Sequence, residues 1–371
     1  MNGCSQAPQS AGTRAAVDRF MESWDHRGMD WDLWLTEVEA ARATYARLIN
    51  ADPSEVAVFS SVSHATAAVA SALDLLAMRA GRKGIVTTGA EFPTVAQVWM
   101  AQAERGFDLR RVPVEDGRVD EARLRTAVDE ETLLLSAAHA YFQTGALLDL
   151  NQAVGAAREA GALLFVDAYQ SMGPRTPDVK ALGIDMLASG CLKFLMGIPG
   201  IAFLYVRPEV AERLEPAVTG WFGRVDPMAF DARTLDWAPG ARRFDTGTPP
   251  ILPAYVARAG MEMVLDVGTD RIAEWTLSLS RHLEAGASHR GLKVMGPSDP
   301  TLRTPTTAIE IPSSVGMSSA EVEGAMRARN VLASARGPAL RLAPNFFNSM
   351  DDVDRALDVL AEITDPGVGK S

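Results

Sequence analysis

The chain is poor in the residues that build metal and disulfide sites. Its 371 residues include only two cysteines, Cys4 and Cys191, too few for a disulfide framework or a cysteine-rich zinc site. The five histidines never occur as HxxxH or HExxH, so the sequence predicts no zinc-protease centre. We therefore expect no metal site.

Positive charge and long apolar runs are also scarce. Lys and Arg number 36 against 47 Asp and Glu, a net charge of −11, so we expect no nucleic-acid or membrane partner, because both bind basic surfaces. The longest apolar runs, such as Ala162–Val166 and Ile201–Val206, fall far short of the roughly 20 residues of a membrane helix. Residues 1–6 lack both parts of a secretory signal, which predicts a cytoplasmic location.

Apolar segments alternate with helical patterns along the first 240 residues. The expected strands are 55–59, 84–88, 109–114, 132–137, 162–167, 186–189 and 201–206. Helical patterns of 10–15 residues between strands indicate a mostly parallel sheet covered on both faces, and one such helix follows Ser63 and runs through Met78. The predicted fold class is α/β, with a large domain over residues 15–240.

The remainder of the chain has a different character. Residues 213–245 are rich in Trp, Pro, Gly and charge with little periodicity, which is typical of a functional segment. Two helices are expected at 253–266 and 271–287. They are followed by a strand, helix, strand and helix at 307–311, 319–329, 339–342 and 350–363. This pattern predicts a small C-terminal α/β domain over 241–371.

Three polar features follow predicted strands, at the edge where parallel sheets bind ligands. The turn Phe59–His64 leads through serines into a helix, whose N-terminus can bind an anion or simply be capped. Asp167 ends an apolar strand, where a carboxylate either caps the chain or meets a cationic ligand. Lys193 lies in an apolar, Gly-rich segment, where desolvation favours Schiff-base chemistry, although a loop lysine can also reach water.

Together the three features fit one cofactor, pyridoxal phosphate (PLP). The serine turn would take the phosphate, Asp167 would pair with the pyridinium nitrogen, and Lys193 would form the Schiff base. Asp167 would keep the ring nitrogen protonated, because an opposite charge favours the charged form. No GxGxxG or GxxxxGK[ST] follows a strand, so a nucleotide-binding protein is disfavoured.

The chain resembles the class V aminotransferase family of fold-type I PLP-dependent enzymes, which includes kynureninase, cysteine desulfurases and isopenicillin N epimerase. The resemblance covers about residues 1–365 and rests on five segments: Val166–Gln170, Ser189–Gly200, Gly220–Gly223, Arg243–Pro250 and Leu340–Asn345. The GWFG and FxxGTPP sequences look most like kynureninase. The resemblance implies a large PLP-binding domain with a mostly parallel seven-stranded sheet and a small C-terminal α/β domain.

The resemblance also implies which residues hold the cofactor. Lys193 is the Schiff-base lysine, Asp167 pairs with the pyridine nitrogen and Gln170 reaches the ring hydroxyl. The other expected cofactor contacts are Val62, Ser63 and Ser189 for the phosphate, Phe92 stacked on the ring, and Trp221 and Thr248 reaching the phosphate of a neighbouring subunit. The last two imply a homodimer with shared active sites.

The expected substrate is a small molecule, an L-α-amino acid. The resemblance implies that Arg341 binds its α-carboxylate, a task that suits a planar guanidinium. Tyr141 and Gln143 face the ring from another strand end, without an assigned role. Residues Gly3–Ser5, within an N-terminal segment 1–14, resemble a family segment that closes over the substrate.

Two departures bear on the reaction. No cysteine lies in the stretch Ser334–Arg341, where a desulfurase needs its nucleophile, and Cys191 is expected to be structural. Leu192 stands where kynureninase has a tyrosine, which removes one contact. The predicted function is a lyase acting at the β-carbon, by C–S or C–C cleavage. An aminotransferase, an epimerase or a decarboxylase is the alternative. A non-catalytic PLP-fold binding protein is disfavoured by the intact set of Lys193, Asp167 and Arg341.

Overall fold

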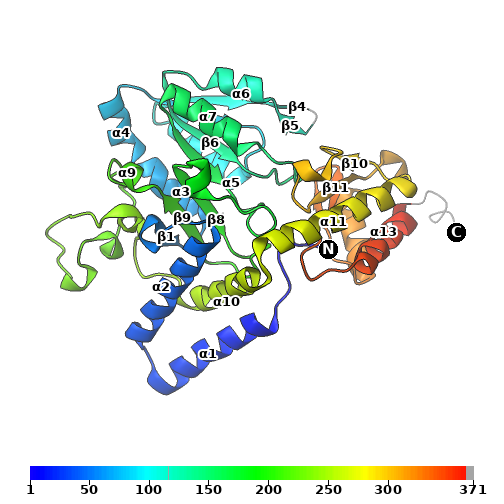
Figure 1. Cartoon of the computed structure of the whole chain (residues 1–371), viewed down its shortest axis with the longest axis horizontal. Coiled ribbons are helices and arrows are strands. Elements are labelled where there is room, and N and C mark those ends of the chain that lie inside the picture. Colours follow the sequence, from blue (N-terminus) through cyan, green and yellow to red (C-terminus); the bar gives the residue numbers. More distant parts are fainter. Residues whose placement is uncertain (116, 365–371) are drawn as a thin grey trace.

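A seven-stranded sheet forms the centre of the larger of two units (Figure 1). The structure is a computed structural model that describes residues 1–115 and 117–364. The strand order is β1-β9-β8-β7-β6-β2-β3. The bounds are β1 Val56–Phe59, β2 Gly84–Thr88, β3 Asp108–Val112, β6 Thr132–Ala138, β7 Leu163–Asp167, β8 Met186–Gly190 and β9 Ala202–Val206. Because β9 alone runs against its two neighbours, the predicted mostly parallel seven-stranded sheet is confirmed.

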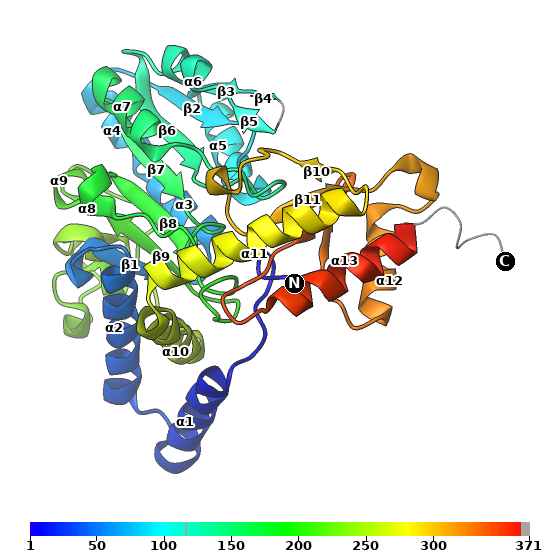
Figure 2. The ribbon, with the colours of Figure 1, turned by 45° about the vertical axis from the view of Figure 1, so that its right-hand side comes forward.

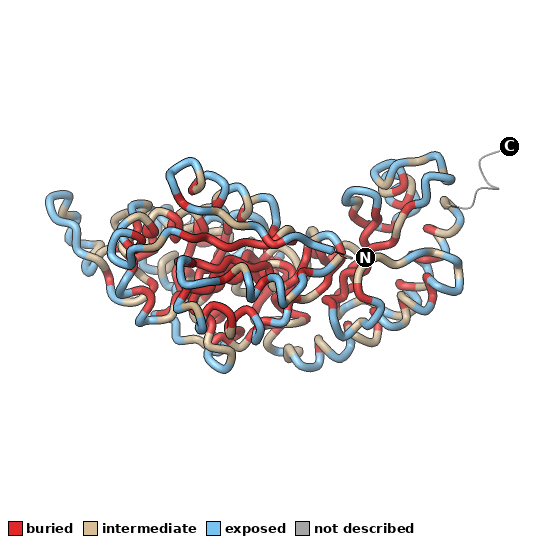
Figure 3. Tube along the Cα trace, turned by 90° about the horizontal axis from the view of Figure 1, so that it is seen from above, coloured by how far each residue is buried: buried red, intermediate tan, exposed pale blue. Residues whose placement is uncertain are grey.

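Alternate residues of each central strand enter two different hydrophobic cores. In β7, Leu164 and Val166 pack in one core, and Leu163 and Phe165 pack in the other. The first core is covered by α2 (Trp31–Leu48), α7 (Leu150–Ala160) and α10 (Ile251–Val267), and the second by α3 (Val62–Ser71), α4 (Leu73–Ala80) and α5 (Pro93–Ala103). Covered on both faces, strands β7, β8 and β9 are buried at every residue, and the buried residues gather in the interior of the large unit in Figure 3.

One predicted strand is shorter than expected, and one predicted helix is divided in two. The strand expected to reach Val114 stops at Val112, because Pro113 lacks the N–H that the ladder needs. The helix expected through Met78 is divided at Ala72. The Ser71 hydroxyl donates to the Ala68 carbonyl and accepts from the Val218 N–H, so it competes with the helical pattern.

The smaller unit has its own antiparallel sheet, in the order β10-β11-β13-β12. The bounds are β10 Val294–Met295, β11 Thr307–Glu310, β12 Ser334–Arg336 and β13 Ala339–Leu342, with helices α11 Thr269–His289, α12 Ser319–Ala328 and α13 Met350–Thr364. Leu340 and Leu342 pack with these helices in a third hydrophobic core. The small α/β unit expected at the C-terminal end is therefore present.

The long helix α11 joins the two units (Figure 2). Ile272 near its start packs in the core of the large sheet, whereas Leu279 and Leu283 pack in the core of the small one. Phe244 and α10 also pack with the large sheet. The predicted boundary at 240/241 stays a prediction, and this packing leads us to propose a boundary inside α11. Residues 365–371 of the predicted small domain lie outside the described residues.

The other elements are short or peripheral. They are α1 Ala11–Arg27, β4 Val114–Glu115, β5 Arg118–Val119, α6 Glu121–Ala127, α8 Val179–Leu182, α9 Pro208–Ala211 and the short turns η1 Pro53–Glu55, η2 Trp221–Gly223, η3 Pro227–Ala229, η4 Gly240–Phe244, η5 Pro300–Leu302 and η6 Ser313–Val315. Three of these turns interrupt the segment 213–245, which otherwise has no regular structure, and part of that segment projects from the body at the left of Figure 1. None of the helices in the described ranges is long and apolar enough to cross a membrane.

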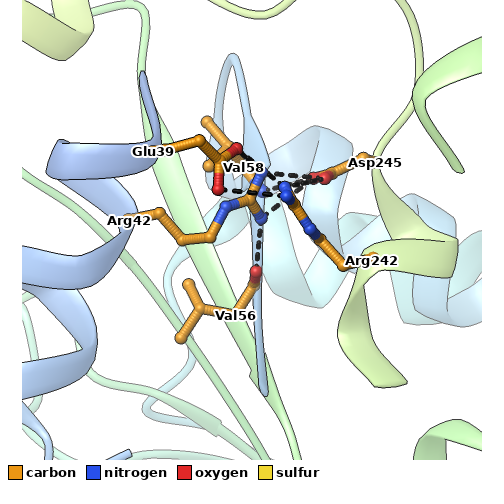
Figure 4. Close-up of polar contacts among 6 residues, drawn as sticks. All are labelled: Glu39, Arg42, Val56, Val58, Arg242 and Asp245. Atoms are coloured by element: carbon orange, nitrogen blue, oxygen red, sulfur yellow. Dashed lines mark hydrogen bonds and ion pairs between the residues drawn. The ribbon is translucent and has the colours of Figure 1, made fainter. Parts of the chain in front are cut away.

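A buried ion network holds the end of this irregular segment against the sheet (Figure 4). Arg42 of α2 lies 2.8 Å from Asp245 and also donates to the Val56 carbonyl. Asp245 in turn accepts the Val58 N–H at 2.8 Å, and Glu39 pairs with Arg242 at 2.7 Å. A buried carboxylate is tolerated when its charge is paired and its oxygens are bonded. The network therefore fixes the residues before Thr248 beside β1.

Candidate active site

Turns at the carboxyl edge of the large sheet enclose a cavity of about 230 Å³. The turns follow β1, β2, β6, β7 and β8, which all point toward this edge. The lining residues are Ser61, Val62, Ser63, Phe92, Thr94, Ala138, Ala140, Phe142, Asp167, Tyr169, Gln170, Leu192 and Lys193. A site at this edge is what the order of strands predicts.

The N-terminus of α3 forms one end of the cavity. Ser61 caps the helix by accepting the His64 N–H at 3.2 Å. The N–H groups of Val62 and Ser63 donate to no residue in the described ranges, as expected for the first turn of a helix. Free amides together with the positive end of a ten-residue helix attract an anion.

Lys193 enters the cavity from the turn after β8. Its Nζ lies 4.3 Å from the centre of the Tyr169 ring and 5.5 Å from that of Phe92. Burial lowers the pKa of Lys193 to about 8, although the charge of Asp167 opposes this shift. Gly190 allows the close packing, because a Cβ there would overlap the Tyr169 hydroxyl. Lys193 is thus a desolvated amine between two aromatic rings.

Asp167 and Gln170 form the floor of the cavity. Asp167 is 6% exposed and one of its oxygens accepts the Tyr169 N–H at 2.9 Å; the other makes no hydrogen bond within the described part of the chain. Burial raises the pKa of Asp167, while the Tyr169 N–H and Lys193 act in the opposite direction. Gln170 donates to the Cys4 carbonyl at 3.2 Å, and its own buried Oε1 accepts no hydrogen bond from the described residues. Both side chains keep acceptor capacity for a ligand.

A second buried carboxyl, Glu91, lies beside Asp167 and was not predicted. Its Oε1 accepts the N–H of Ala138, the residue paired with Asp167 in the sheet, at 2.8 Å. Burial, and then the charge of Asp167, raise the pKa of Glu91 to about 8. Glu91 is therefore a neutral acid at pH 7, which leaves the negative charge on Asp167 without a like-charged neighbour.

Arg341, on β13 of the small unit, contacts the wall of the cavity without lining it. It donates to the carbonyl of Phe142, a lining residue, to the Ser334 hydroxyl at 2.7 Å and to the Ser5 hydroxyl at 3.3 Å. Four arginines of the described ranges are buried, and the three besides Arg341 each pair with a carboxylate: Arg42 with Asp245, Arg243 with Glu212 and Arg303 with Glu284. Arg341 is 1% exposed and has no carboxylate partner among the described residues. A ligand carboxylate would supply the missing charge.

The first seven residues form a strap between the two units. Gly3 bonds to Ala343 of the small unit, and Ala7 bonds to Leu192 next to Lys193. Cys4 is buried between Phe194 and Ala343. The strap therefore brings Ser5 to Arg341 and the Cys4 carbonyl to Gln170.

The predicted site residues divide into two groups. The cavity brings together Val62, Ser63, Phe92, Asp167, Gln170 and Lys193. Ser189 is buried beneath it, with its hydroxyl donating to the Gly190 carbonyl at 2.8 Å. Tyr141 lies in the hydrophobic core, Gln143 is exposed, and neither Trp221 nor Thr248 lines the cavity of its own chain. The roles given to all these residues stay predictions.

Sequence reasoning missed two aromatic lining residues. Tyr169 is two residues after Asp167, and Phe142 is adjacent to Tyr141. Both residues lie in strand-end segments that the sequence points to. Their position beside predicted site residues is the signal that could have identified them. Which neighbouring side chain turns inward depends on how the backbone leaves the strand. Phe142 packs edge-on against Phe92, with ring centres 5.2 Å apart.

The chain is similar in sequence to one protein family and to several named proteins. The family model Aminotransferase class-V matches residues 25–339. A protein of Bacillus subtilis named "Uncharacterized aminotransferase YcbU" is 34% identical over 361 residues, covering 97% of this chain and 93% of that protein. A kynureninase of Deinococcus radiodurans is 34% identical over 264 residues, covering 70% of this chain and 62% of that protein.

Solved structures with the same fold include a cysteine desulfurase and a cystine C-S lyase. A cysteine desulfurase from Thermococcus onnurineus has a TM-score of 0.86 at 22% identity, covering 98% of this chain and 93% of that chain. The cystine C-S lyase C-DES, in complex with cysteine persulfide, has a TM-score of 0.86 at 19% identity, covering 97% of this chain and 96% of that chain. At these identities the likeness shows the fold.

Proposed function

Because this chain belongs to the class V aminotransferase family, we propose that it is a PLP-dependent lyase that breaks a bond at the β-carbon of an L-α-amino acid. Pyridoxal phosphate, the cofactor of that family, is the cofactor of this chain. When bound, it supplies an electron sink for charge that develops at the substrate Cα. One observation carries the proposal: Lys193 and Asp167 share a cavity, and Arg341, a buried arginine that pairs with no carboxylate among the described residues, donates to the carbonyl of the cavity-lining residue Phe142.

The residues present fit this cofactor. The free amides of Val62 and Ser63 would hold the phosphate, and Asp167 would pair with the ring nitrogen. The unpartnered Oε1 of Gln170 is an acceptor for the ring hydroxyl, and Phe92 offers a flat face at the cavity wall. Lys193 would bind the aldehyde carbon.

The protein side chains divide the remaining tasks. Lys193, with a pKa near 8, is a base that can take the proton from Cα and return one to the product. Arg341 would hold the α-carboxylate and so orient the bonds at Cα. The strap and the aromatic side chains Phe92, Phe142 and Tyr169 would limit the access of water.

The two cysteines of this chain do not support the thiol chemistry of desulfurases. Cys4 and Cys191 are both buried, and burial raises the pKa of the Cys191 thiol, which disfavours a thiolate. The kynureninase-like segments and the relatives named as kynureninase support cleavage at the β-carbon. Transamination is the second candidate, because a relative that covers 97% of this chain carries an aminotransferase name.

A substrate panel with the purified holoenzyme separates the two candidates. A lyase acting on a cysteine conjugate consumes water and releases a thiol, pyruvate and ammonia without any keto acid. An aminotransferase turns over only when a keto acid accepts the amino group. We expect keto-acid-independent product, and strict dependence on a keto acid would overturn the lyase proposal in favour of transamination.

We also propose a homodimer with shared active sites. Trp221 lies in the projecting segment, which exposes Val225, Phe230 and Leu235 by 62%, 74% and 61%. Exposed apolar groups gathered in one segment are typical of an interface. Thr248 is exposed and follows the segment fixed by the Arg42–Asp245 pair, so both side chains are available to a partner subunit.

Mixing two inactive variants tests this arrangement. Lys193→Ala and Thr248→Trp should each be inactive alone, whereas a hybrid dimer has one intact site if the sites are shared. With random mixing about a quarter of wild-type activity should return. No recovery after dissociation and reassembly, or full activity in a monomer, would contradict shared sites.

A further inference from the structure

A second arginine shares one face of the small sheet with Arg341. Leu340 and Leu342 point into the core formed with α11, α12 and α13, so Arg341 points to the opposite face. Antiparallel pairing places Ser334 opposite Arg341 and Arg336 opposite Ala339. Because strand residues two apart share a face, Arg336 lies on the face of Arg341 as its diagonal neighbour, about 7–8 Å away between backbones.

This face is turned toward the cavity of the large unit. Arg341 donates to the carbonyl of Phe142, a residue that lines the cavity. Arg336 is at the end of β12, exposed, and long enough to bring its charge near the same space. Its charge and that of Arg341 both act to lower the pKa of Lys193, which places the three cations in one electrostatic environment.

Neither arginine has a carboxylate of its own in the described part of the chain. The one hydrogen bond of the Arg336 side chain goes to the Ala335 carbonyl, at 2.6 Å. The nearby carboxylates are engaged elsewhere: Glu310 pairs with Lys293 at 2.7 Å, and Glu323 binds Arg327 and the Ala335 N–H. Arg341 and Arg336 therefore share one face of the small sheet and pair with no carboxylate among the described residues, and a single α-carboxylate would neutralise only one of the two charges.

We propose that Arg336 binds a second acidic group of the substrate, so that the preferred substrates are α-amino acids whose side chain ends in a carboxylate or a related oxyanion. The inference rests on the proposed function, because Arg341 takes the α-carboxylate there. Arg336 is then a specificity-determining residue. An anion held between two cations at the mouth also gains from electrostatic attraction during binding.

The test uses two ligands that differ only in charge, S-carboxymethyl-L-cysteine and S-carbamoylmethyl-L-cysteine. Dissociation constants are measured on the holoenzyme from changes in its visible absorbance and by calorimetry. The wild-type protein should bind the acid at least tenfold more tightly than the amide. Arg336→Gln should remove that preference through loss of affinity for the acid, and Arg336→Lys should keep part of it, because a point charge remains.

A matched control is Arg329→Gln, an exposed arginine at the end of α12, which should leave both constants unchanged. Equal binding of the two ligands by the wild type, or a preference that survives Arg336→Gln, would overturn the inference while leaving the proposed function intact. If neither ligand nor any other α-amino acid changes the absorbance, the proposed function fails and the inference fails with it.

Discussion

Charge is balanced differently on the two sides of the cavity. On the large-unit side, Lys193 faces Asp167, and the neighbouring Glu91 is kept neutral by burial. On the small-unit side, Arg341 and Arg336 have no carboxylate partners within the described ranges. On the large-unit side, the charge of Lys193 is balanced by Asp167 before a substrate binds. On the small-unit side, the charges of the two arginines are balanced only when an anion binds. The comparison indicates that the sheet edge belongs to the cofactor and the small unit to the substrate.

The largest effect should come from removing the amine of the large-unit side. Lys193→Ala should reduce turnover by orders of magnitude and remove the visible absorbance of the bound cofactor, because no other described amine lines the cavity. Lys83→Ala, at an exposed position, is the matched control. A Lys193→Ala protein that still becomes covalently labelled with cofactor on borohydride treatment would show that another lysine is the anchor.

Removing the opposing charge should have the next largest effect. Loss of one partner of a buried pair costs about 3–5 kcal/mol, so Asp167→Ala should slow turnover by roughly 10²–10⁴-fold. Because the charge of Asp167 raises the pKa of Lys193, the variant should also lower that pKa further below 8. The pH dependence of Lys193 labelling in the cofactor-free protein measures this shift. Near-native turnover would remove Asp167 from the mechanism.

The neutral acid beside Asp167 should appear in the pH dependence of stability. Glu91 has a pKa of about 8 when folded against 4.5 otherwise, so the folded state holds its proton more tightly. Its contribution to the free energy of unfolding is complete below pH 4.5 and is lost as pH rises toward 8, by at most about 1.4 kcal/mol per pH unit. Glu91→Gln should flatten this slope between pH 5 and 8 in denaturant titrations. The exposed Glu130→Gln should not, and an unchanged slope in Glu91→Gln would mean that Glu91 is ionised.

On the small-unit side, a change of cation geometry should affect the substrate alone. Arg341→Lys should raise KM for the amino acid at least tenfold, about 1.4 kcal/mol, because a lysine offers a point charge in place of a fork. The cofactor absorbance should stay as in the wild type. The variant should hardly distinguish an amino acid from its decarboxylated amine. Loss of cofactor with an unchanged KM would make Arg341 a structural residue.

The smallest effect should come from the strap. Ser5→Ala removes the 3.3 Å bond from Arg341 and the 3.1 Å bond from Ser5 to the Ser334 hydroxyl, but Arg341 keeps its bonds to Ser334 and Phe142. KM should therefore rise only about two- to fivefold, because the long Ser5 bond is one of three that hold the guanidinium. Gln6→Ala removes a strap bond to the Gly197 carbonyl without touching Arg341 and serves as the control. Equal effects of the two substitutions would assign Ser5 to strap stability rather than to Arg341.

Local patterns were sufficient for the fold and for the cofactor side. The strand ends at Phe59, Asp167 and Gly190 follow from runs of apolar residues, and parallel strands necessarily bring such ends to one edge. The segments carrying Asp167, Lys193 and the serine turn could therefore be placed together from order alone. The predicted strand 109–114 is too long at its end. The apolar character of the sequence continues to Val114, whereas the backbone pairing of the strand stops before Pro113.

The sequence alone could not predict contacts between segments that lie far apart along the chain. The hydroxyl of Ser5 lies near Arg341 only because the strap bonds to Ala343, and Glu91 becomes a neutral acid only because the sheet buries it beside Asp167. The sequence by itself determined the strands, their polar ends and the lysine-aspartate pair, since these depend on periodicity within short segments. The tertiary structure decided which charged side chains have a partner and which are left to bind a ligand. The reason is that a charged side chain can find its partner more than 300 residues away along the chain, as Arg341 does with Ser5.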